Sequence, residues 1–363
     1  MAYGTVNADT LVTSTSGGIL GAGNASIMKN RIINGAMVVS QRNGTSSVAT
    51  ADSAYNLDRW KVSSSTSATV TVAQSTTAPT GFANSMLYTV SSGSATTSGQ
   101  FFGFRQNIEG YNIADLGFGT ASAKTVTVSF WVRCSLTGTY AVTLVNSDES
   151  QKYPTSFTVN TANTWEQKTI TVAGSTTATW LTTNGIGLGL QIYPSLGSSY
   201  QGTANAWTAS SIYGPTGLAD FVATTSNTFY ITGVQLEVGS SATGFEYRIY
   251  STELQNCQRY FEKSYNQNEA VGASGVTAFR VSVVGFAGNE YATSSYFKVS
   301  KRTAPTMAYY TNGGAANSWV ALPAAASRTP VTNSVGENSF EVYVVGVTTD
   351  STLQGSWTAS AEL

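Results

Sequence analysis

The sequence predicts an all-β protein: an antiparallel β-sandwich with one short helix, followed by a small C-terminal antiparallel β-domain. From about Val62 onward, short runs of β-branched and aromatic residues are separated by turns rich in Ser, Thr and Gly, which is the spacing of a sandwich or barrel. Several runs alternate strictly between apolar and polar residues, as strands with one buried and one solvated face do. The 363 residues include 7 Trp, 19 Tyr and 15 Phe, which supply large side chains for a core.

The clearest predicted strand covers residues 126–134 (VTVSFWVRC), where Val126, Val128, Phe130 and Val132 share one face. Residues 186–192 repeat this period of two. Further strands of the sandwich are expected at 68–73, 140–145, 167–172 and 229–238. In the C-terminal part, strands are expected at 276–286, 295–300, 318–322, 339–347 and 355–363.

A single helix is predicted directly after the sandwich. Thr252 and Gln255 have the spacing of a capping box, in which the first residue caps the helix and the fourth reaches back. Leu254, Cys257 and Phe261 then recur at helical spacing, so a helix over residues 253–263 is expected to pack on the sandwich. This places Cys257 in the core and not in a metal site.

Composition divides the chain into four parts. Residues 1–30 are small and hydroxylated, with too few large apolar residues for a core, and are interpreted as an arm that docks on a partner. Residues 31–250 form the predicted sandwich, and residues 251–275 the helix and a linker rich in Gly, Asn and Gln. Residues 276–363 form the C-terminal β-domain.

Composition also excludes several functional classes. The chain has no His, which removes Ser-His-Asp catalysis and His-ligated zinc. Lys and Arg number 18 against 19 Asp and Glu, without the basic stripe that nucleic-acid binding requires. No run approaches the roughly 18 apolar residues of a membrane helix, and the amino terminus lacks the basic region of a signal peptide. Cys134 and Cys257 match no metal-binding spacing; no cofactor or metal is expected.

The strongest candidate for a binding site is the segment 193–217 (YPSLGSSYQGTANAWTASSIYGPTG), a long polar stretch between two predicted strands. Long irregular segments in compact domains are often functional. Flat rings among small hydrogen-bonding residues stack on sugar faces and bond sugar hydroxyls. The candidate glycan contacts are Tyr193, Tyr200, Gln201, Asn205, Trp207 and Tyr213. The alternative is that these rings anchor the loop or fill a subunit interface. A net charge of −1 fits a neutral polysaccharide, which needs no basic cleft.

Paired carboxylates hydrolyse glycosides without any histidine, so an enzyme is a further alternative. The acidic residues are scattered, however, and Asp148 and Glu149 fall in a polar turn. The sequence does not place two carboxylates across a cleft, and no catalytic residue is predicted.

A series of short motifs runs through the chain in a fixed order. They are NRIINGAM at 30–37, SQR at 40–42, YNLDRW at 55–60, FWVR at 130–133, FYITGVQLEVG at 229–239, FE at 245–246 and ELQNCQRYF at 253–261. The series resembles tail-fibre-like structural proteins of tailed bacteriophages, especially those of aquatic bacteria, over about residues 1–262. FKVSKRTAPT at 297–306 and WTASAEL at 357–363 also look like segments of such proteins.

This resemblance implies a virion component with a jelly-roll β-sandwich like that of carbohydrate-binding modules. The expected role is a non-enzymatic tail fibre subunit that recognises host-surface glycans and mediates adsorption; a capsid-decorating or head-fibre protein is the alternative. The expected partners are other virion proteins of the tail or capsid, reached through the arm, host cell-surface polysaccharide, and further copies in a homotrimer. Neither nucleic acid nor membrane insertion is expected. The protein is expected in the virion, assembled in the host cytoplasm.

Overall fold

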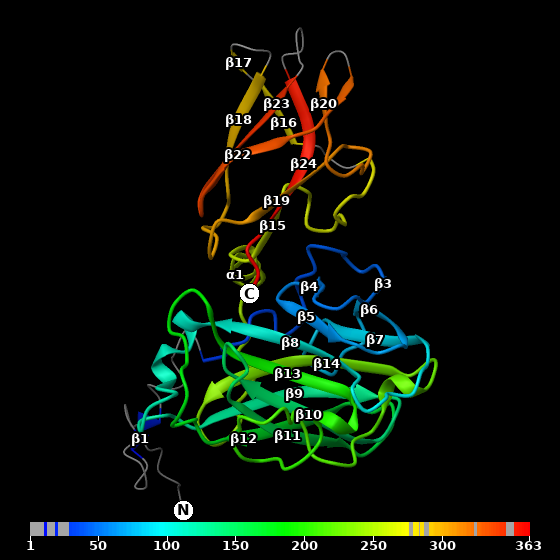
Figure 1. Ribbon diagram of the computed structural model, residues 1–363, viewed down its shortest axis with the longest axis vertical. Coiled ribbons are helices and arrows are strands. Elements are labelled where there is room, and N and C mark those ends of the chain that lie inside the picture. Colours follow the sequence, from blue (N-terminus) through cyan, green and yellow to red (C-terminus); the bar gives the residue numbers. More distant parts are fainter. Residues whose placement is uncertain are drawn as a thin grey trace, which may run out of the picture.

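The computed structural model describes residues 11–12, 19–20, 29–275, 279–282, 284–286, 290–322, 325–345 and 352–363. A large β-sandwich is joined to a smaller, elongated C-terminal β module, with the helix α1 (Tyr250–Gln258) between them (Figure 1). Of the predicted arm, the described residues before Lys29 are the paired strands β1 (Leu11–Val12) and β2 (Ile19–Leu20). Residues 29 and 30 of the predicted arm are also described, and Asn30 is buried in the sandwich, whereas the rest of the arm lies outside the described residues.

Two six-stranded sheets pack face to face in the sandwich. Sheet 1 contains, in spatial order, β11 (Lys152–Val159), β10 (Gly138–Val145), β13 (Ile186–Leu196), β8 (Phe101–Glu109), β5 (Trp60–Ser64) and β4 (Tyr55–Leu57). Sheet 2 contains β12 (Glu166–Val172), β9 (Val126–Cys134), β14 (Thr228–Val238), β7 (Ser85–Ser92), β6 (Thr69–Ser75) and β3 (Val48–Ala49). The strand pairings within the two sheets are antiparallel, so the predicted fold class is confirmed.

Alternation along the strands fills the space between the sheets. In β9, Val126, Val128, Phe130 and Val132 are fully buried in one core. Leu188 and its alternate neighbours from β13 enter the same core from sheet 1. Short 3-10 turns, η1 (Gly110–Asn112), η2 (Ala114–Leu116), η3 (Ser198–Tyr200) and η4 (Phe221–Ala223), lie in the connections. Among the described residues, no helix has the length and hydrophobicity that crossing a bilayer requires.

The C-terminal module has its own core and two sheets. One contains β15 (Phe261–Lys263), β24 (Thr352–Ser360), β20 (Trp319–Leu322) and β21 (Ala326–Arg328), with β16 (Phe279–Ser282) and β19 (Thr306–Tyr310) also paired to β24. The other contains β17 (Val284–Phe286), β18 (Glu290–Tyr296), β23 (Ser339–Val345) and β22 (Val331–Val335). Trp319, Phe340 and Trp357 are buried together between them.

The predicted helix over residues 253–263 is wrong at both ends. The helix begins at Tyr250, with Ile249 as the cap residue and no side-chain capping bond. In its first turn, the Glu253 carboxylate accepts a hydrogen bond from the Asn34 backbone N–H of the sandwich. At the other end, Phe261 leaves the helix and pairs with Ser360 of β24. Strand pairing with a segment about a hundred residues later therefore overrides the local helical pattern. Cys257 is buried in the core, as predicted.

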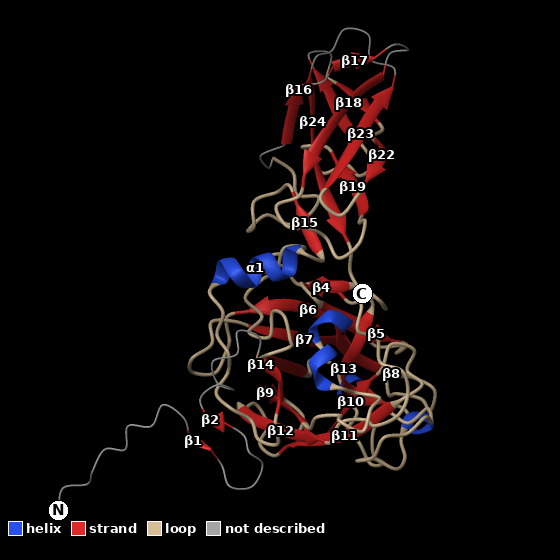
Figure 2. Cartoon of the chain, turned by 90° about the vertical axis from the view of Figure 1, so that its left-hand side faces the viewer, coloured by secondary structure: helices blue, strands red, loops and turns tan. Residues whose placement is uncertain are grey.

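The two modules are joined by buried charged groups. Figure 2 shows α1 between the modules, at the base of the C-terminal one. Beside it, the Glu362 carboxylate pairs with Arg59, which is 1% exposed, and lies 3.0 Å from Arg42 Nη2. The Arg59 guanidinium also lies 3.5 Å from the centre of the Tyr260 ring. Glu109 accepts hydrogen bonds of 2.9 and 2.6 Å from the Arg259 guanidinium.

Glu362→Gln is expected to lower the free energy of unfolding by about 3–5 kcal/mol, because it leaves the buried Arg59 guanidinium without its carboxylate. Urea unfolding followed by Trp fluorescence measures the change. Asp115→Asn is the matched control, since it removes a carboxylate from Arg31 in a pair whose acidic side chain is 48% exposed; its cost should stay below about 1 kcal/mol. Equal, small changes for both variants would contradict this role of Glu362.

Candidate functional site

The segment after β13 folds back over the outer face of sheet 1. The Tyr213 backbone N–H donates to the Tyr200 carbonyl at 2.8 Å, so the two ends of the loop pair with each other. The Thr143 hydroxyl of β10 donates to the Tyr213 carbonyl at 2.5 Å. Further along, the Ala219 N–H donates to the Thr139 carbonyl at 2.8 Å. These bonds hold the loop against the sheet and keep its aromatic residues in place.

Beneath the loop lies a cavity of about 150 Å³, called the tyrosine cavity below. Its lining residues come from β5, β8, β13, the loop and the β10–β11 turn: Ser63, Phe101, Arg105, Glu149, Tyr193, Leu196, Tyr200 and Tyr213. The rings meet edge to face, with centroids 5.7 Å apart for Tyr193 and Tyr213 and 5.9 Å for Tyr200 and Tyr213. Phe101 lies 5.7 Å from Tyr200 in the same manner. Such geometry fixes the rings through their quadrupoles.

Glu149 is the polar centre of the tyrosine cavity. Its carboxylate accepts hydrogen bonds from Arg105 at 2.7 Å, from Gln191 Nε2 at 3.0 Å and from the Tyr213 hydroxyl at 2.6 Å. The Tyr193 hydroxyl donates to Gln191 Oε1 at 2.8 Å. Burial, together with the Glu149 carboxylate, raises the pKa of Tyr213. The hydroxyl groups of Tyr193 and Tyr213 therefore stay protonated at neutral pH and act as fixed hydrogen-bond donors.

The six predicted contacts separate into three groups. Tyr193, Tyr200 and Tyr213 meet at the tyrosine cavity. The amides of Gln201 and Asn205 are used within the fold. Gln201 donates to the Leu196 carbonyl and accepts from the Gly217 N–H. Asn205 Oδ1 accepts a hydrogen bond from the Thr155 hydroxyl. These two amides thus tie the loop to itself and to β11.

Trp207, the third group, is half-buried and packs against the hydrophobic core. Its ring lies 5.4 Å from Trp180, 5.3 Å from Tyr153 and 5.9 Å from Phe118, all roughly edge to face. The indole N–H donates to the Ala173 carbonyl at 2.8 Å. Trp207 therefore anchors the loop to the edge of the sandwich, away from the tyrosine cavity.

The sequence reasoning missed the residues that sheet 1 contributes to the cavity. Arg105 belongs to β8, a strand that the sequence pattern does not predict. Glu149 lies in a turn that the sequence predicts to be solvated, but its carboxylate reaches the cavity. One usable signal was present. Gln191 is a polar residue at an outward position of the predicted strand at 186–192, two residues before Tyr193, and marks the face on which the site lies.

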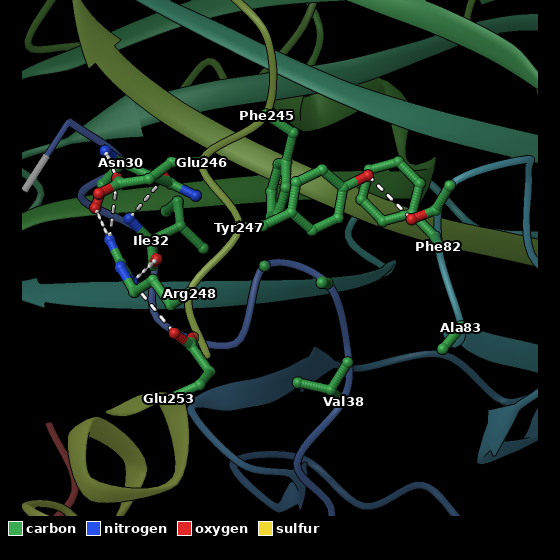
Figure 3. Close-up of a pocket in the computed structure, with 13 residues that line it drawn as sticks. Asn30, Ile32, Val38, Phe82, Ala83, Phe245, Glu246, Tyr247, Arg248 and Glu253 are labelled. Carbon is green, nitrogen blue, oxygen red and sulfur yellow. Dashed lines mark hydrogen bonds and ion pairs between the residues drawn. The ribbon is translucent and has the colours of Figure 1, made fainter. Parts of the chain in front are cut away.

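A second, apolar cavity of about 180 Å³ lies where the segment after Lys29 meets the segment before α1. Its wall contains the rings of Phe82, Phe245 and Tyr247, whose centroids lie 4.9–5.4 Å apart (Figure 3). The polar side chains at its edge are bonded to one another: Arg248 contacts Glu253 at 3.3 Å (Figure 3). The rings give this cavity an apolar surface, and the charged side chains that line it, among the described residues, are paired with one another.

No cluster of three or more Cys, Asp or Glu side chains suited to a metal ion occurs within the described residues. Both cysteines are free and buried.

Comparison with known proteins gives structural similarity without a sequence match. No family model and no curated protein matches the chain. The enzymatically active domain of bacteriophage CBA120 tailspike protein 4 is similar over 58% of this chain and 22% of that chain, at 12% identity and a TM-score of 0.33. The family 11 carbohydrate-binding module of Clostridium thermocellum Lic26A-Cel5E covers 55% of this chain and 99% of its own, at 12% identity and a TM-score of 0.28.

A xylan-binding domain from carbohydrate-binding module family 22 covers 51% of this chain and 90% of its own, at 14% identity and a TM-score of 0.30. At these identities and TM-scores the similarities assign neither a ligand nor an activity to this chain.

Trp207→Ala is expected to lower the free energy of unfolding by about 3 kcal/mol, the lower end for truncating a core Trp, because the ring is half-buried. Chemical denaturation measures this loss. The control is Tyr111→Ala, which truncates a ring that is 62% exposed and should change stability by less than about 0.5 kcal/mol. A Trp207→Ala protein as stable as the control would remove the anchoring role.

Proposed function

We propose that this protein is a non-enzymatic glycan-binding protein whose site is the tyrosine cavity. The observation that carries the proposal is the meeting of Tyr193, Tyr200 and Tyr213 over an ordered polar network of Arg105 and Glu149. A sugar ring offers apolar C–H faces and hydroxyls that both donate and accept. Aromatic walls with a small number of fixed polar groups match that chemistry.

Preorganisation supports the same proposal. The Arg105–Glu149 ion pair and the Tyr213 hydroxyl hold each other in place, so little side-chain entropy remains to be lost on binding. Tyr200 differs from its neighbours because, among the described residues, no hydrogen bond to its hydroxyl is found. Its half-exposed ring is the part of the cavity that a ligand meets first.

The absence of catalysis is part of the proposal. Glycoside hydrolysis ordinarily uses two carboxyl groups that flank the scissile bond. Among the described residues that line the tyrosine cavity, Glu149 is the one carboxylate, and three donors occupy it. A single, fully engaged carboxylate favours binding over hydrolysis.

We further propose that the protein acts in a phage virion as a homotrimeric tail fibre subunit. The resemblance of the motifs at 30–37, 55–60 and 229–239 to tail-fibre-like proteins supports this placement. Repeated copies raise the avidity of weak sugar sites by about 10²–10⁴.

Tyr200→Ala is expected to weaken binding to host-surface polysaccharide at least tenfold, which corresponds to about 1.4 kcal/mol. Isothermal titration calorimetry with the purified polysaccharide measures the affinity, and Tyr111→Ala serves as the matched aromatic control outside the cavity. Circular dichroism verifies that both variants are folded. Incubation of the wild type with the same polysaccharide should release no short oligosaccharides. Unchanged affinity in Tyr200→Ala, or released oligosaccharides, would contradict the proposal.

The placement in the virion makes a separate prediction. Light scattering of the purified protein should give three times the chain mass of 38.0 kDa, and antibody labelling of intact virions should mark the tail. A monomer at micromolar concentration would refute the trimer. Labelling confined to the head would favour the head-fibre alternative and leave glycan binding untouched.

A further inference from the structure

A second cation lies on the outer face of sheet 1, directly beside the tyrosine cavity. Lys61 of β5 and Arg105 of β8 are paired across neighbouring strands in the antiparallel register. Trp60 and Val62 point into the core, so Lys61 and Ser63 point outward together. Ser63 and Arg105 line the tyrosine cavity. Lys61 therefore lies about 7 Å further along the same face, two residues from Ser63.

The two cations have unequal surroundings. Like charges that face each other across two strands destabilise a sheet. Arg105 is neutralised by Glu149 at 2.7 Å. Lys61 belongs to none of the ion pairs found among the described residues. The Lys61 ammonium group lies 5.9 Å from the centre of the Tyr55 ring.

Asp52, Glu362 and Glu149 act on Lys61 electrostatically, but none of them forms an ion pair with it among the described residues. Asp52 accepts the Ser64 N–H at 2.9 Å, and Glu362 pairs with Arg42 and Arg59. Partial burial and the charge of Arg105 lower the pKa of Lys61. Lys61 is therefore a half-buried ammonium group at the rim of the binding face that has no carboxylate in direct contact among the described residues.

We propose that Lys61, beside Arg105, forms an anionic subsite that extends the tyrosine cavity, so that the bound glycan is an acidic polysaccharide. The proposal rests on the glycan-binding function of the tyrosine cavity. A sugar held among the tyrosines places the next unit of its chain over Lys61, about 7 Å along the strand. A carboxylate or sulfate there supplies the direct ion-pair partner that Lys61 lacks among the described residues, and charge-assisted hydrogen bonds to an ammonium group are among the stronger ones in proteins.

The subsite changes what net charge implies about the ligand. The whole-chain charge of −1 fits a neutral polysaccharide, but recognition depends on the charge of the site. At the site, Glu149 pairs with Arg105, whereas Lys61 has no ion-pair partner among the described residues and can contact an anionic sugar group directly.

The test uses a printed panel of bacterial surface polysaccharides, both neutral and acidic. The wild type is expected to bind acidic members, and each bound member is then measured in three forms: native, carboxyl-reduced and desulfated. Loss of at least tenfold in affinity after carboxyl reduction identifies a uronate as the anion, and the same loss after desulfation identifies a sulfate. Raising the NaCl concentration should remove most of the preference for the native form.

Variants separate this proposal from the one on which it rests. Lys61→Gln should reproduce the tenfold loss on the native polysaccharide and change nothing on the neutralised form, whereas Lys61→Arg should retain the affinity. Lys124→Gln removes an exposed charge elsewhere and is the matched control. Because Lys61 has no ion pair to lose, the fold should tolerate its replacement.

Each outcome has one meaning. Equal affinity of wild type and Lys61→Gln for the native polysaccharide, or equal binding of neutral and acidic members, overturns the anionic subsite while glycan binding stands. Binding to no member of the panel, or binding that Tyr200→Ala leaves unchanged, overturns the tyrosine cavity and the subsite together.

Discussion

The sandwich depends on how the buried, irregular segment at residues 30–41 satisfies its backbone polar groups. A buried N–H or C=O without a partner is costly, and this segment has few strand partners. Side chains supply the missing bonds. Asn30 Oδ1 accepts from the Ile32 N–H, Gln106 Oε1 accepts from the Ile33 N–H, and Asp58 Oδ2 accepts from the Gln41 N–H, all at 2.6–2.9 Å. Polar residues are thus buried here because the backbone requires them.

This requirement gives the motifs at 30–37 and 55–60 a physical meaning. Asn34 bonds the Val39 N–H and carbonyl through its two amide atoms, and the Trp60 indole donates to the Asn34 carbonyl at 3.1 Å. Gly35 sits so close to β14 that a Cβ atom would lie 2.1 Å from the Val234 carbonyl oxygen. The motifs therefore specify how the segment is enclosed, while the tyrosine cavity is built from residues outside them. A fold resemblance carried by these motifs leaves ligand identity open.

Alternation made part of the fold predictable. Residues 126–134 and 186–192 belong to β9 and β13 because their inner positions are uniformly apolar. Strand β8 had not been predicted. Tyr193, Leu363 and Arg259 contact its outer positions Gly103, Asn107 and Glu109. Seven of its nine residues are therefore buried, and burial does not alternate along the strand. The predicted end of the helix was wrong for another reason. Phe261 pairs with a residue of β24, which lies far along the chain and gives no local signal. In the candidate site, the length and polarity of the segment at 193–217 made three of the lining tyrosines predictable. Arg105 and Glu149 were not predictable, because strand pairing and a turn bring them to the cavity from elsewhere in the sequence.

The C-terminal module is held to the sandwich at two neighbouring points. The chain leaves through α1 and returns at residues 361–363, where Arg302 donates to the Ala361 and Glu362 carbonyls and Asn107 donates to the Leu363 carbonyl. Two domains connected by one linker swing freely unless a large interface restrains them. With a double connection, the elongated module acts as a lever. A sideways pull at its far tip is delivered to the sandwich as torque through the helix and the returning strand.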